Sequence, residues 1–543
     1  MRATMMDYPL TVVQLFERAQ RYFPHTEVVS RMPDKSLHRE TFSQFYHRTR
    51  SLGAALARAG LKKGDRVATL MWNHYAHLEA YFGVPVSGGV LHTLNLRLHP
   101  DDIAYTINDA ADRFLIVDDL LIPLYEQLRG KANFERVIVA RLSGKALPAG
   151  CEDYEAFLAG GDAGFDYPAI DERDPLGICY TSGTTGRPRG VVYSHRSTVL
   201  HALSSMLPDA YGISRRDSIC MVAPMFHING WGLAFMAAAV GAKLVFPGPA
   251  LDAESLLGLF ETEQVTFAGA VTTVWLGVLQ LLEREPGRWR LAPGLRLLIG
   301  GTAAPESLIR AFDRFGVTVL HAWGMTETSP LATISAPGPH LAALDEQQRY
   351  AVRAKHGLAM PLVDLRVVAE GVEVPCDGKT MGELQVRGPY ITGAYHNLAH
   401  DPEKFTEDGW LRTGDVAVID ATGYIKLTDR IKDLIKSGGE WISSVDLENL
   451  IMAHPAVAEA AVIAVAHPKW GERPLAVVVL KPGQSASAEE LQKFLEPKVA
   501  KWWLPDRYVF ADSIPRTSTG KFLKSRLREL YAGRPAEPAS GRP

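Results

Sequence analysis

Short apolar runs rich in β-branched residues alternate with amphipathic stretches along most of this chain. Phe114–Val117, Arg136–Val139 and Leu295–Ile299 have the length and composition of buried strands. Thr11–Tyr22 and Pro305–Phe315 instead repeat apolar residues at the spacing of one helix face. Strands that alternate with helices predict an α/β fold on largely parallel sheets. A further strand is predicted over Leu176–Tyr180 and a further helix over Leu256–Glu263.

The pattern changes near Tyr424. Glycine-rich, strand-like segments precede it, and the charged stretch Asp429–Asp433, which has little to bury, follows it. Because 543 residues exceed what one hydrophobic core normally holds, we place a domain boundary at Arg430–Asp433. The second domain is predicted to be a compact α+β unit, and the Pro- and Gly-rich tail 533–543 is predicted to be disordered. The elements expected on the two sides of the boundary are strands Met381–Val386, Gly414–Val418, Ala460–Ala466 and Leu475–Leu480 and helices Ser444–Ala453, Glu489–Trp503 and Phe522–Tyr531.

Composition and charge disfavour several classes of protein. With 47% apolar residues and a formal net charge of -3, the chain has no cationic excess for nucleic acid or an anionic membrane surface. Its longest apolar stretch, Trp231–Ala242, ends at Lys243 and is too short to span a bilayer. The cysteines form no C-x-x-C pair, which disfavours a structural zinc or a disulfide framework and fits a reducing compartment. We therefore expect a soluble cytoplasmic protein without a signal peptide or a transmembrane segment.

The most informative polar segment is Thr181–Gly190, directly after the predicted strand Leu176–Tyr180. It combines three glycines with four hydroxyl side chains and two arginines. Glycines let backbone N–H groups close around an anion, and hydroxyl groups and a cation add donors, so the segment is predicted to hold phosphate. Its spacing does not fit the Walker A motif, so any ATP is held by another architecture. The alternative, a flexible linker, is disfavoured by the apolar stretch Val191–Tyr193 that follows.

Two further loops are predicted after strands. His321–Thr328 follows the apolar run Val317–Leu320 and brings together an aromatic, a hydroxyl and a carboxylate, which suits base stacking and Mg²⁺ binding. The alternative is a turn with a core Trp and a surface Glu. Gly300–Pro305 follows Leu295–Ile299, and its two glycines permit the close approach of a flat ligand. A tight turn between a strand and a helix explains that segment almost as well.

Two segments closer to the C-terminus carry weaker signals. Trp410–Asp415 ends in an Asp at a predicted turn, where a carboxylate can accept both hydroxyls of a ribose. The alternative is an Asx turn. Pro515–Lys521 places a Lys after a glycine turn and ahead of the basic helix Phe522–Tyr531, and the alternative is a solvated helix start. Taken alone, each segment leaves both interpretations open.

Together, these segments carry a family resemblance. The chain resembles the adenylate-forming superfamily of acyl-CoA synthetases, luciferases and peptide-synthetase adenylation domains over Leu10–Tyr531. Pro224–Trp231 and Ile435–Ser443 are most similar to medium- and long-chain fatty acyl-CoA synthetases and to methylmercaptopropionate-CoA ligases. The resemblance implies an α/β fold with a large multi-sheet N-terminal domain over 1–430, a hinge at 431–433 and a small mobile α+β domain over 434–532. The motifs that carry it are Tyr180–Gly190, Pro224–Trp231, Gly300–Pro305, Trp323–Glu327, Gly382–Leu384, Gly414–Asp415, Asp429–Arg430, Lys436–Glu440 and Thr519–Lys521.

The resemblance implies an acid–CoA ligase that uses ATP, CoA and Mg²⁺ in two half-reactions. A carboxylate attacks the α-phosphate of ATP to give an acyl-adenylate and pyrophosphate, and the CoA thiol then displaces AMP. The expected acid is a medium- or long-chain fatty acid, with 3-methylmercaptopropionate or an aryl acid as alternatives. The alternative of another class is a non-catalytic acyl-nucleotide sensor. A homodimer is expected by analogy with long-chain relatives.

The family's catalytic roles transfer to four positions. Lys521 is expected to bridge the carboxylate and the α-phosphate, and Thr326 to touch phosphate. Glu327 is expected to hold Mg²⁺ together with Thr184. His227 lies in the segment that resembles the family's acyl-binding motif. The expected catalytic residues are therefore Lys521, Thr326, Glu327 and His227.

The nucleotide contacts also follow by resemblance. Trp323 is expected to stack on adenine, and Asp415 and Arg430 to hold the ribose. At the phosphate loop the family usually has Lys where this chain has Arg189, which keeps the charge but is planar and forked. The full set of expected ATP and AMP contacts is Thr181, Ser182, Gly183, Thr184, Thr185, Gly186, Arg189, Gly301, Thr302, Ala303, His321, Ala322, Trp323, Gly324, Met325, Asp415 and Arg430.

The acyl and CoA sites complete the expectations. His227 stands where amino-acid-activating domains carry Asp, so an ammonium group has no acidic partner and an amino-acid substrate is disfavoured. Trp231 matches the residue that gates the fatty-acid tunnel in long-chain relatives, and the alternative is a core Trp. The expected acyl pocket is His227, Ile228, Trp231 and Gly301. The expected CoA and hinge residues are Lys432, Lys436, Ser437, Gly438, Gly439, Glu440 and Trp441.

Overall fold

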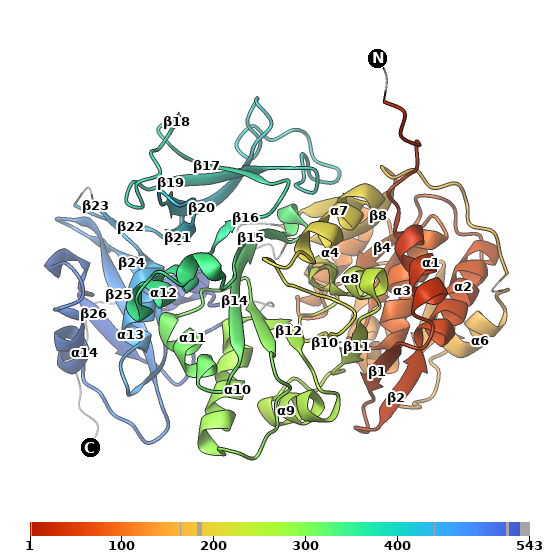
Figure 1. Ribbon diagram of the computed structural model, residues 1–543, viewed down its shortest axis with the longest axis horizontal. Coiled ribbons are helices and arrows are strands. Elements are labelled where there is room, and N and C mark those ends of the chain that lie inside the picture. Colours follow the sequence, from red (N-terminus) through yellow and green to blue (C-terminus); the bar gives the residue numbers. More distant parts are fainter. Residues whose placement is uncertain (2, 163, 182–186, 439, 517–520, 533–543) are drawn as a thin grey trace. The chain divides into compact units, whose positions relative to one another are not determined.

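The computed structural model describes residues 1–543 except 2, 163, 182–186, 439, 517–520 and 533–543 (Figure 1). By its internal contacts the chain divides into two compact units. Unit 1 comprises Met1–Asp364 and Arg387–Leu411, and unit 2 comprises Leu365–Val386 and Arg412–Pro543. Each unit is built largely on its own sheets and is described by itself.

The first sheet of unit 1 has seven strands. They are β3 Arg66–Leu70, β4 Val90–Thr93, β5 Phe114–Asp118, β6 Arg136–Ala140, β7 Glu152–Asp153, β8 Pro175–Tyr180 and β9 Gly190–Ser194. Their order is β7-β6-β5-β3-β4-β8-β9, and neighbours pair in parallel except β8 and β9, which are antiparallel. All five residues of β5 are buried, as is typical of strands in sheets covered on both faces. The strands predicted at these positions are confirmed.

The second sheet of unit 1 has nine strands. They are β1 Glu27–Arg31, β2 Leu37–Thr41, β10 Ser218–Cys220, β11 Lys243–Phe246, β12 Phe267–Ala270, β13 Arg296–Ile299, β14 Thr318–Gly324, β15 Leu331–Ser335 and β16 Leu358–Ala359. Their order is β16-β15-β14-β13-β12-β10-β11-β1-β2. The six strands from β14 to β1 in this order pair in parallel, and antiparallel strands flank them on both sides. The carboxyl ends of the parallel strands therefore share one edge, where open α/β sheets bind ligands.

Helices connect and cover these strands (Figure 1). Capping residues mark where helices begin. Thr11 directly precedes the first helix, and its backbone N–H donates to Gln14 Oε1 at 2.8 Å. The predicted helices over Thr11–Tyr22, Leu256–Glu263 and Pro305–Phe315 are confirmed with small shifts at their ends. The helices of unit 1 are α1 Val12–Tyr22, α2 Phe42–Arg58, α3 Tyr75–Val86, α4 Pro100–Ala110, α5 Ile122–Leu128, α6 Tyr154–Ala159, α7 His195–Ser205, α8 Leu233–Val240, α9 Ala253–Thr262, α10 Thr272–Arg284, α11 Glu306–Asp313 and α12 Glu346–Arg353. Short 3-10 helices are η1 Asp119–Leu121, η2 Ile228–Gly232, η3 Thr326–Thr328 and η4 Pro339–Leu341.

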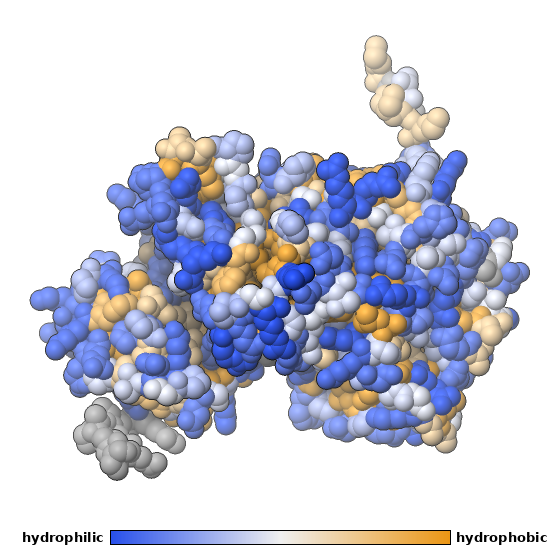
Figure 2. All heavy atoms as spheres, turned by 60° about the horizontal axis from the view of Figure 1, so that its bottom comes forward, coloured by the Kyte–Doolittle hydropathy of each residue, from blue (hydrophilic) through white to orange (hydrophobic). Residues whose placement is uncertain are grey.

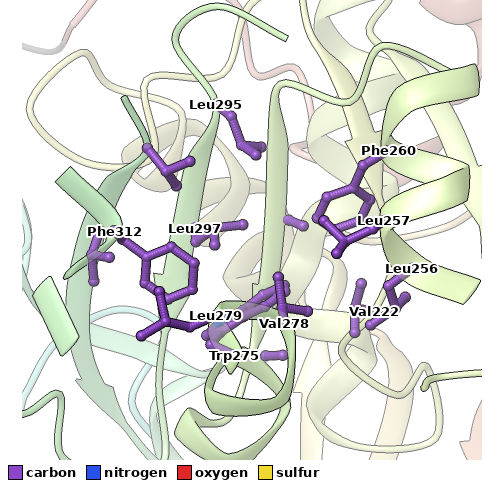
Figure 3. Packing of buried hydrophobic residues seen from close by; sticks show 14 of the residues in the cluster. Val222, Leu256, Leu257, Phe260, Trp275, Val278, Leu279, Leu295, Leu297 and Phe312 are labelled. Carbon is purple, nitrogen blue, oxygen red and sulfur yellow. The ribbon is translucent and has the colours of Figure 1, made fainter. Parts of the chain in front are cut away.

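The core beneath the nine-stranded sheet is aromatic and aliphatic (Figure 3). Trp275 on α10 is fully buried and packs against Phe260 on α9, with 6.3 Å between the two ring centres. Its indole N–H donates to the Leu298 carbonyl of β13 at 3.1 Å, so the one polar atom of the side chain is satisfied. Truncation of such a core Trp to Ala would cost about 3–5 kcal/mol. This core fixes the strand ends that carry the predicted loop Gly300–Pro305.

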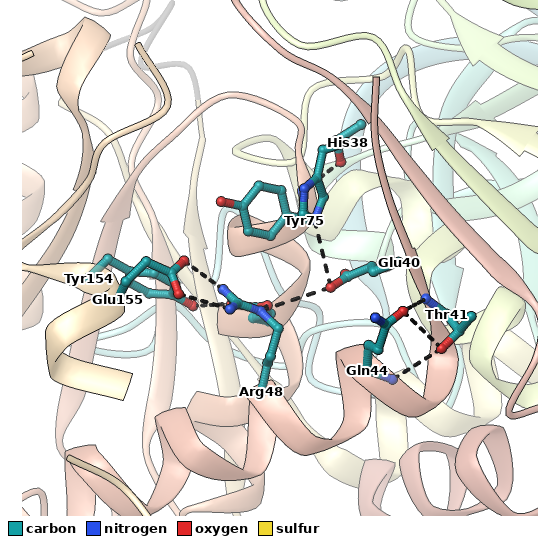
Figure 4. Close-up of polar contacts among 10 residues, drawn as sticks. His38, Glu40, Thr41, Gln44, Arg48, Tyr75, Tyr154 and Glu155 are labelled. Atoms are coloured by element: carbon teal, nitrogen blue, oxygen red, sulfur yellow. Dashed lines mark hydrogen bonds and ion pairs between the residues drawn. The ribbon is translucent and has the colours of Figure 1, made fainter. Parts of the chain in front are cut away.

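A buried polar cluster joins α2, α3, α6 and β2 in unit 1 (Figure 4). Arg48 forms ion pairs with Glu79, which is fully buried, and with the exposed Glu155. The Tyr154 hydroxyl donates to Glu79 at 2.6 Å. Glu40 lies 3.9 Å from Arg48 and is also buried. Burial raises the pKa of Glu79 to about 8, although Arg48 favours its charged form.

Unit 2 contains two sheets of five strands. The first has the order β18-β17-β19-β20-β21, with strands β17 Asp364–Ala369, β18 Val372–Glu373, β19 Gly382–Arg387, β20 Leu411–Ile419 and β21 Ile425–Arg430. The second comprises β22 Ile435–Ser437, β23 Glu440–Ile442, β24 Val457–His467, β25 Gly471–Leu480 and β26 Arg507–Phe510. Its order is β23-β22-β25-β24, and β26 pairs with β25. The helices of unit 2 are α13 Ser444–Met452, α14 Ala488–Leu495 and α15 Lys524–Tyr531, with the 3-10 helix η5 Lys501–Trp503.

One predicted helix of unit 2 is wrong in length. The apolar spacing predicts a helix over Glu489–Trp503, but α14 ends at Leu495 and a separate short helix η5 follows. Pro497 explains the break, because proline has no backbone N–H to continue the helical hydrogen bonds and its ring clashes with the carbonyl four residues earlier. The other predicted elements of this region, including helix Ser444–Ala453 and strands Ala460–Ala466 and Leu475–Leu480, are confirmed.

The two compact units of the structure divide the chain at other residues than the predicted domain boundary at Arg430–Asp433. Strands β19, β20 and β21, which precede Arg430–Asp433 in sequence, group with the C-terminal residues. A hinge is defined by two arrangements of a chain, so the hinge at 431–433 and the domains 1–430 and 434–532 stay predictions. The tail 533–543 lies outside the described residues.

The surface carries mostly hydrophilic side chains, with apolar ones in small groups, on the face that Figure 2 shows. Scattered exposed apolar residues are normal for folded proteins. Within the described residues, no helix has both the length and the apolar character needed to cross a membrane.

Candidate active site

The predicted phosphate loop connects the antiparallel strands β8 and β9. Its described ends are tied together: Thr181 N–H donates to the Arg189 carbonyl at 3.0 Å, and Arg189 N–H donates to Thr181 Oγ1 at 3.1 Å. The guanidinium of Arg187 lies 5.1 Å from the ring centre of Tyr105 on α4. The strands on both sides thus fix where the loop starts and ends. The predicted phosphate contacts Ser182, Gly183, Thr184, Thr185 and Gly186 lie outside the described residues.

Helix α4 and strand β4 support the strand end before the loop. The Tyr180 hydroxyl donates to Asp109 Oδ2 at 2.6 Å. His92 contacts the Tyr180 ring at 5.1 Å between ring centres and pairs with Asp112 at 2.7 Å. The pattern of apolar runs along the chain does not reveal these residues, because their polar atoms meet only through tertiary packing.

Glu327 and Thr326 lie in η3, immediately after β14. The Tyr395 hydroxyl donates to Glu327 Oε1 at 2.7 Å, and the Tyr193 hydroxyl of β9 donates to the Thr326 carbonyl at 2.7 Å. The backbone N–H of Thr392 also donates to the Glu327 carbonyl at 2.8 Å. Burial raises the pKa of both tyrosine hydroxyls, so they stay protonated donors. The expected catalytic pair is therefore held at strand and loop ends, and Tyr395 is a site residue that sequence reasoning missed.

Arg189 contacts the same tyrosine. Its guanidinium lies 5.2 Å from the ring centre of Tyr395, within the range of a cation–π interaction. Its Nη1 lies 3.3 Å from Asp401 Oδ2. The described end of the phosphate loop is thereby linked through Tyr395 to Glu327, although these residues are far apart in sequence.

Residues His321–Gly324 form the end of strand β14, and not a loop as predicted. The strand is extended because β15 pairs with it across the sheet, His321 opposite Ser335 and Trp323 opposite Thr333. At Gly324 a side chain has no room, since a Cβ would lie 1.7 Å from the Pro330 carbonyl oxygen. Trp323 is buried at this strand end, and Ala322 and Met325 lie on either side of it along the chain.

His321 supports the neighbouring loop as a neutral side chain. Burial lowers its pKa to about 4. A neutral imidazole has one donor and one acceptor nitrogen. Nδ1 lies 3.0 Å from the Ala354 carbonyl, and Nε2 accepts from Ala304 N–H at 3.3 Å. The proton is therefore on Nδ1, and His321 orients the loop that follows β13.

The loop Gly300–Pro305 begins directly after β13, as predicted. Gly301 has φ +76°, a left-handed conformation that favours glycine. Thr302 Oγ1 accepts from Thr272 N–H at 3.0 Å, and Thr272 Oγ1 donates to the Ala303 carbonyl at 2.6 Å. The backbone that is expected to lie along adenine is thus held from the start of α10.

The acyl-pocket residues meet this loop. Trp231 in η2 is buried, and its φ is +59°. A Cβ on Gly269 would lie 3.0 Å from the indole, and a Cβ on Gly300 would lie 3.3 Å from it. Glycine at these two strand ends therefore makes room for the Trp231 ring. His227 directly precedes η2, while the side chain of Ile228 lies outside what the structure describes.

In unit 2, the predicted ribose pair is brought together. Asp415 on β20 and Arg430 on β21 are directly opposite in the antiparallel ladder, with Oδ1 and Nε 3.4 Å apart. The predicted turn at Trp410–Asp415 is wrong: Leu411–Asp415 are part of β20, which lies between β19 and β21 in its sheet and pairs with β21 from Asp415 onward. Opposite charges on facing strands stabilise each other and hold the carboxylate in one orientation.

The predicted CoA segment is a hairpin of β22 and β23. Gly438 has φ +62°, and a Cβ there would lie 2.9 Å from the Trp470 ring, so both conformation and space demand glycine. Its N–H donates to the Trp470 carbonyl at 2.8 Å. Lys436 lies 4.4 Å above the ring centre of Trp441. Ser437 and Glu440 pair across the hairpin, and Gly439 lies outside the described residues.

Lys521 and Lys432 lie at two connections of unit 2. Lys521 precedes α15, which is anchored by a buried ion pair of 2.7 Å between Lys524 Nζ and Glu448 Oε1. Residues 517–520 lie outside the described chain. Burial lowers the pKa of Lys432, and its carbonyl accepts from Arg528 of α15 at 3.3 Å. Lys521 thus comes shortly before α15 in the chain, and Lys432 is hydrogen-bonded to the same helix.

Comparison with known proteins agrees with this arrangement. The family described as AMP-binding enzyme matches residues 15–396, and the AMP-binding enzyme C-terminal domain matches residues 446–521. The chain belongs to this family of enzymes. The predicted family resemblance and fold class are confirmed.

Relatives match along almost the whole chain. A long-chain-fatty-acid–CoA ligase of Thermus thermophilus is 50% identical over 97% of this chain and 97% of its own length. A 3-methylmercaptopropionyl-CoA ligase of Ruegeria pomeroyi is 44% identical over 98% and 99%. Among solved structures, an anthranilate CoA ligase in complex with anthranoyl-AMP superposes with a TM-score of 0.87 at 25% identity, over 98% of this chain and 99% of that one.

Proposed function

We propose that this protein is an ATP-dependent, AMP-forming acid–CoA ligase for medium- or long-chain fatty acids. The observation that carries the proposal is the buried Glu327 carboxylate, oriented by Tyr395 beside the described end of the phosphate loop. An anion-binding loop and an oriented carboxylate at one strand edge suit the binding of a nucleoside triphosphate with a divalent cation.

The first half-reaction joins the acid to ATP. A carboxylate oxygen forms a bond to the α-phosphorus, and the bond from that phosphorus to the bridging oxygen breaks, which releases pyrophosphate. Such phosphoryl chemistry depends on positioning and neutralisation of charge. The loop ending in Arg189 is assigned to the β- and γ-phosphates, Thr326 to phosphate, and Lys521 to the space between the carboxylate and the α-phosphate.

Glu327 fits a Mg²⁺ ligand. Mg²⁺ in phosphoryl-transfer enzymes is typically held by one or two carboxylates together with substrate phosphates and water. The Tyr395 hydrogen bond to Oε1 orients the carboxylate, and Oε2 is assigned to the metal. When bound, the ion neutralises charge on the phosphates. Thr184, the other assigned ligand, lies in the undescribed part of the loop.

The second half-reaction transfers the acyl group. The CoA sulfur forms a bond to the acyl carbonyl carbon, and the bond to the AMP oxygen breaks. The hairpin at Gly438 is assigned to the pantetheine arm, because a left-handed glycine next to Trp470 offers backbone without a side chain. Movement about Lys432 between the two half-reactions is part of the proposal.

The acid is proposed from the site and from the relatives' names. His227 offers no carboxylate for an ammonium group, and Trp231 lies against Gly300 beside the proposed adenine loop. A fatty acid is the first choice because of the long-chain relative. The second choice is 3-methylmercaptopropionate, and an aryl acid is a further alternative. A homodimer and a cytoplasmic location also stay proposals; the four free cysteines fit a reducing compartment.

Acid-dependent ATP–pyrophosphate exchange tests the proposal. The acids run from acetate to palmitate and include 3-methylmercaptopropionate and benzoate, and CoA consumption is measured in parallel. We expect exchange and CoA consumption to peak with acids of six or more carbons. If none of the acids supported exchange, the protein would be a non-catalytic nucleotide sensor. A peak at 3-methylmercaptopropionate or benzoate would make that acid the proposed substrate in place of a fatty acid.

A further inference from the structure

Arg189 has a docking place on loop residues 395–401, away from the backbone of its own loop. Its guanidinium lies 5.2 Å from the Tyr395 ring centre, and Nη1 lies 3.3 Å from Asp401 Oδ2. The other oxygen of Asp401 accepts from Glu403 N–H at 3.0 Å, so the carboxylate is held in place. The backbone of Arg189 is fixed by Thr181. The side chain can therefore exchange partners while its backbone stays in place.

The docking place suits arginine better than lysine. A planar guanidinium can lie on an aromatic face and bind a carboxylate at the same time, whereas an ammonium is a compact, strongly hydrated point charge. Arg189 and Asp401 are both about one third exposed, with side-chain values of 40% and 30%. A pair with that exposure is weak. It can hold Arg189 when the loop is empty and yield to a phosphate chain with several charges.

We propose that Asp401 is a positioning residue for pyrophosphate release, because it competes with pyrophosphate for Arg189. The inference rests on the proposed function, which assigns Arg189 to the β- and γ-phosphates. Pyrophosphate must displace Asp401 before Arg189 can bind it, so the loop holds pyrophosphate less tightly than an unpaired Arg189 would. When pyrophosphate leaves, Asp401 takes Arg189 back and Tyr395 keeps contact with its guanidinium.

Equilibrium binding of magnesium pyrophosphate, measured by titration calorimetry on the full-length protein, tests this without any catalysis. Asp401→Asn keeps the size of the side chain and removes the competing charge. We expect its dissociation constant for pyrophosphate to fall about two- to fivefold, the range for a pair of this exposure. Glu403→Gln is the matched control: it removes one negative charge from the same loop at an exposed residue, and we expect no change.

Arg189→Ala supplies the second arm. In that background Asp401→Asn should have no effect on pyrophosphate binding, because the two residues act as a pair. Equal tightening by Asp401→Asn and Glu403→Gln, or tightening that persists without Arg189, would overturn the inference. Melting temperatures of all variants check the fold. Failure of acid-dependent exchange in the unmutated protein would overturn the proposed function separately, because the binding experiment needs no acid.

Discussion

The Tyr395 hydroxyl donates a 2.7 Å hydrogen bond to Oε1 of Glu327, and both side chains are buried. One carboxylate oxygen is thereby oriented by the protein. The same tyrosine presents its ring to Arg189 at the end of the phosphate loop. The side chain of Tyr395 thus contacts both Glu327, the proposed metal ligand, and Arg189, the residue proposed to bind pyrophosphate.

Tyr395→Phe separates these two contacts, since it keeps the ring and removes the donor. We expect the Mg²⁺ concentration for half-maximal exchange to rise about tenfold or more, as when outer hydrogen bonds of metal ligands are lost. Tyr390→Phe is the control, because that buried hydroxyl donates to the Pro361 carbonyl at 2.9 Å and not to Glu327. An unchanged Mg²⁺ requirement in Tyr395→Phe would show that the bond does not orient a metal ligand.

Trp231→Ala tests the acyl pocket. The indole fills space beside Gly269 and Gly300, so its removal opens space at the proposed acyl end. We expect the relative kcat/KM among acids that differ by several methylenes to change about tenfold or more, with a smaller change in the KM for ATP. The control Trp275→Phe alters a buried Trp on α10 and should lower stability without changing the acid profile. An unchanged profile in Trp231→Ala would make Trp231 a core residue.

Lys521→Ala should divide the two half-reactions. Lys521 is assigned to the α-phosphate, so ATP–pyrophosphate exchange should be lost while CoA transfer from supplied acyl-adenylate is largely kept. Gly438→Ala should give the opposite pattern, because a Cβ at φ +62° would press against Trp470 in the proposed pantetheine hairpin. Equal loss of both half-reactions in Lys521→Ala would contradict the account with two conformations.

The buried ion pair of Lys524 and Glu448 should stabilise unit 2 only while both charged partners are present. Burial raises the pKa of Glu448 to about 7, and the Glu448 carboxylate raises the pKa of Lys524 against the effect of burial. Lys524→Met leaves Glu448 without its cation, so the free energy of unfolding should fall by about 3–5 kcal/mol in urea denaturation. Replacing both, with Lys524→Met and Glu448→Leu, should recover most of the loss. A double variant as unstable as the single one would refute this explanation.

Glu79 should make the stability of unit 1 depend on pH. Its folded pKa is about 8, above the ordinary value of 4.5. Between these values the folded chain binds more protons than the unfolded chain, so the free energy of unfolding falls as pH rises. The contribution is complete below pH 4.5 and lost as pH passes 8. Glu79→Gln should flatten the dependence of the melting temperature on pH in this window.

The control for Glu79→Gln is a substitution of Glu155, which pairs with the same arginine, Arg48. Glu155 is exposed and pairs with Arg48 at 2.8 Å, so Glu155→Gln removes a charge from the cluster at its surface. The dependence on pH should persist in that variant. Glu40 of β2, Tyr75 of α3 and Tyr154 of α6 also lie near Glu79, and they are unchanged in both variants. Parallel curves for Glu79→Gln and the unmutated protein would refute the prediction.

The local pattern predicted most elements well. Alternation of apolar runs and amphipathic stretches placed β5, β6, β8 and α1, because strand and helix periods are local properties of the chain. It failed where distant pairing or a proline decides. Strand β14 continues through Trp323 because β15 pairs with it, and Pro497 ends α14 before the apolar spacing does.

The sequence by itself determined the alternating α/β plan, the phosphate loop after a buried strand, and the identity of residues such as Glu327 that match the family's motifs. Tertiary structure decided which side chains meet. Tyr395 reaches Glu327 across 68 residues, and Asp401 reaches Arg189 across 212. Such contacts are absent from local periodicity, because they form only when sheet and loops bring distant backbone together. The arginine in the loop was visible in the sequence, and its aromatic and acidic partners became visible in the fold.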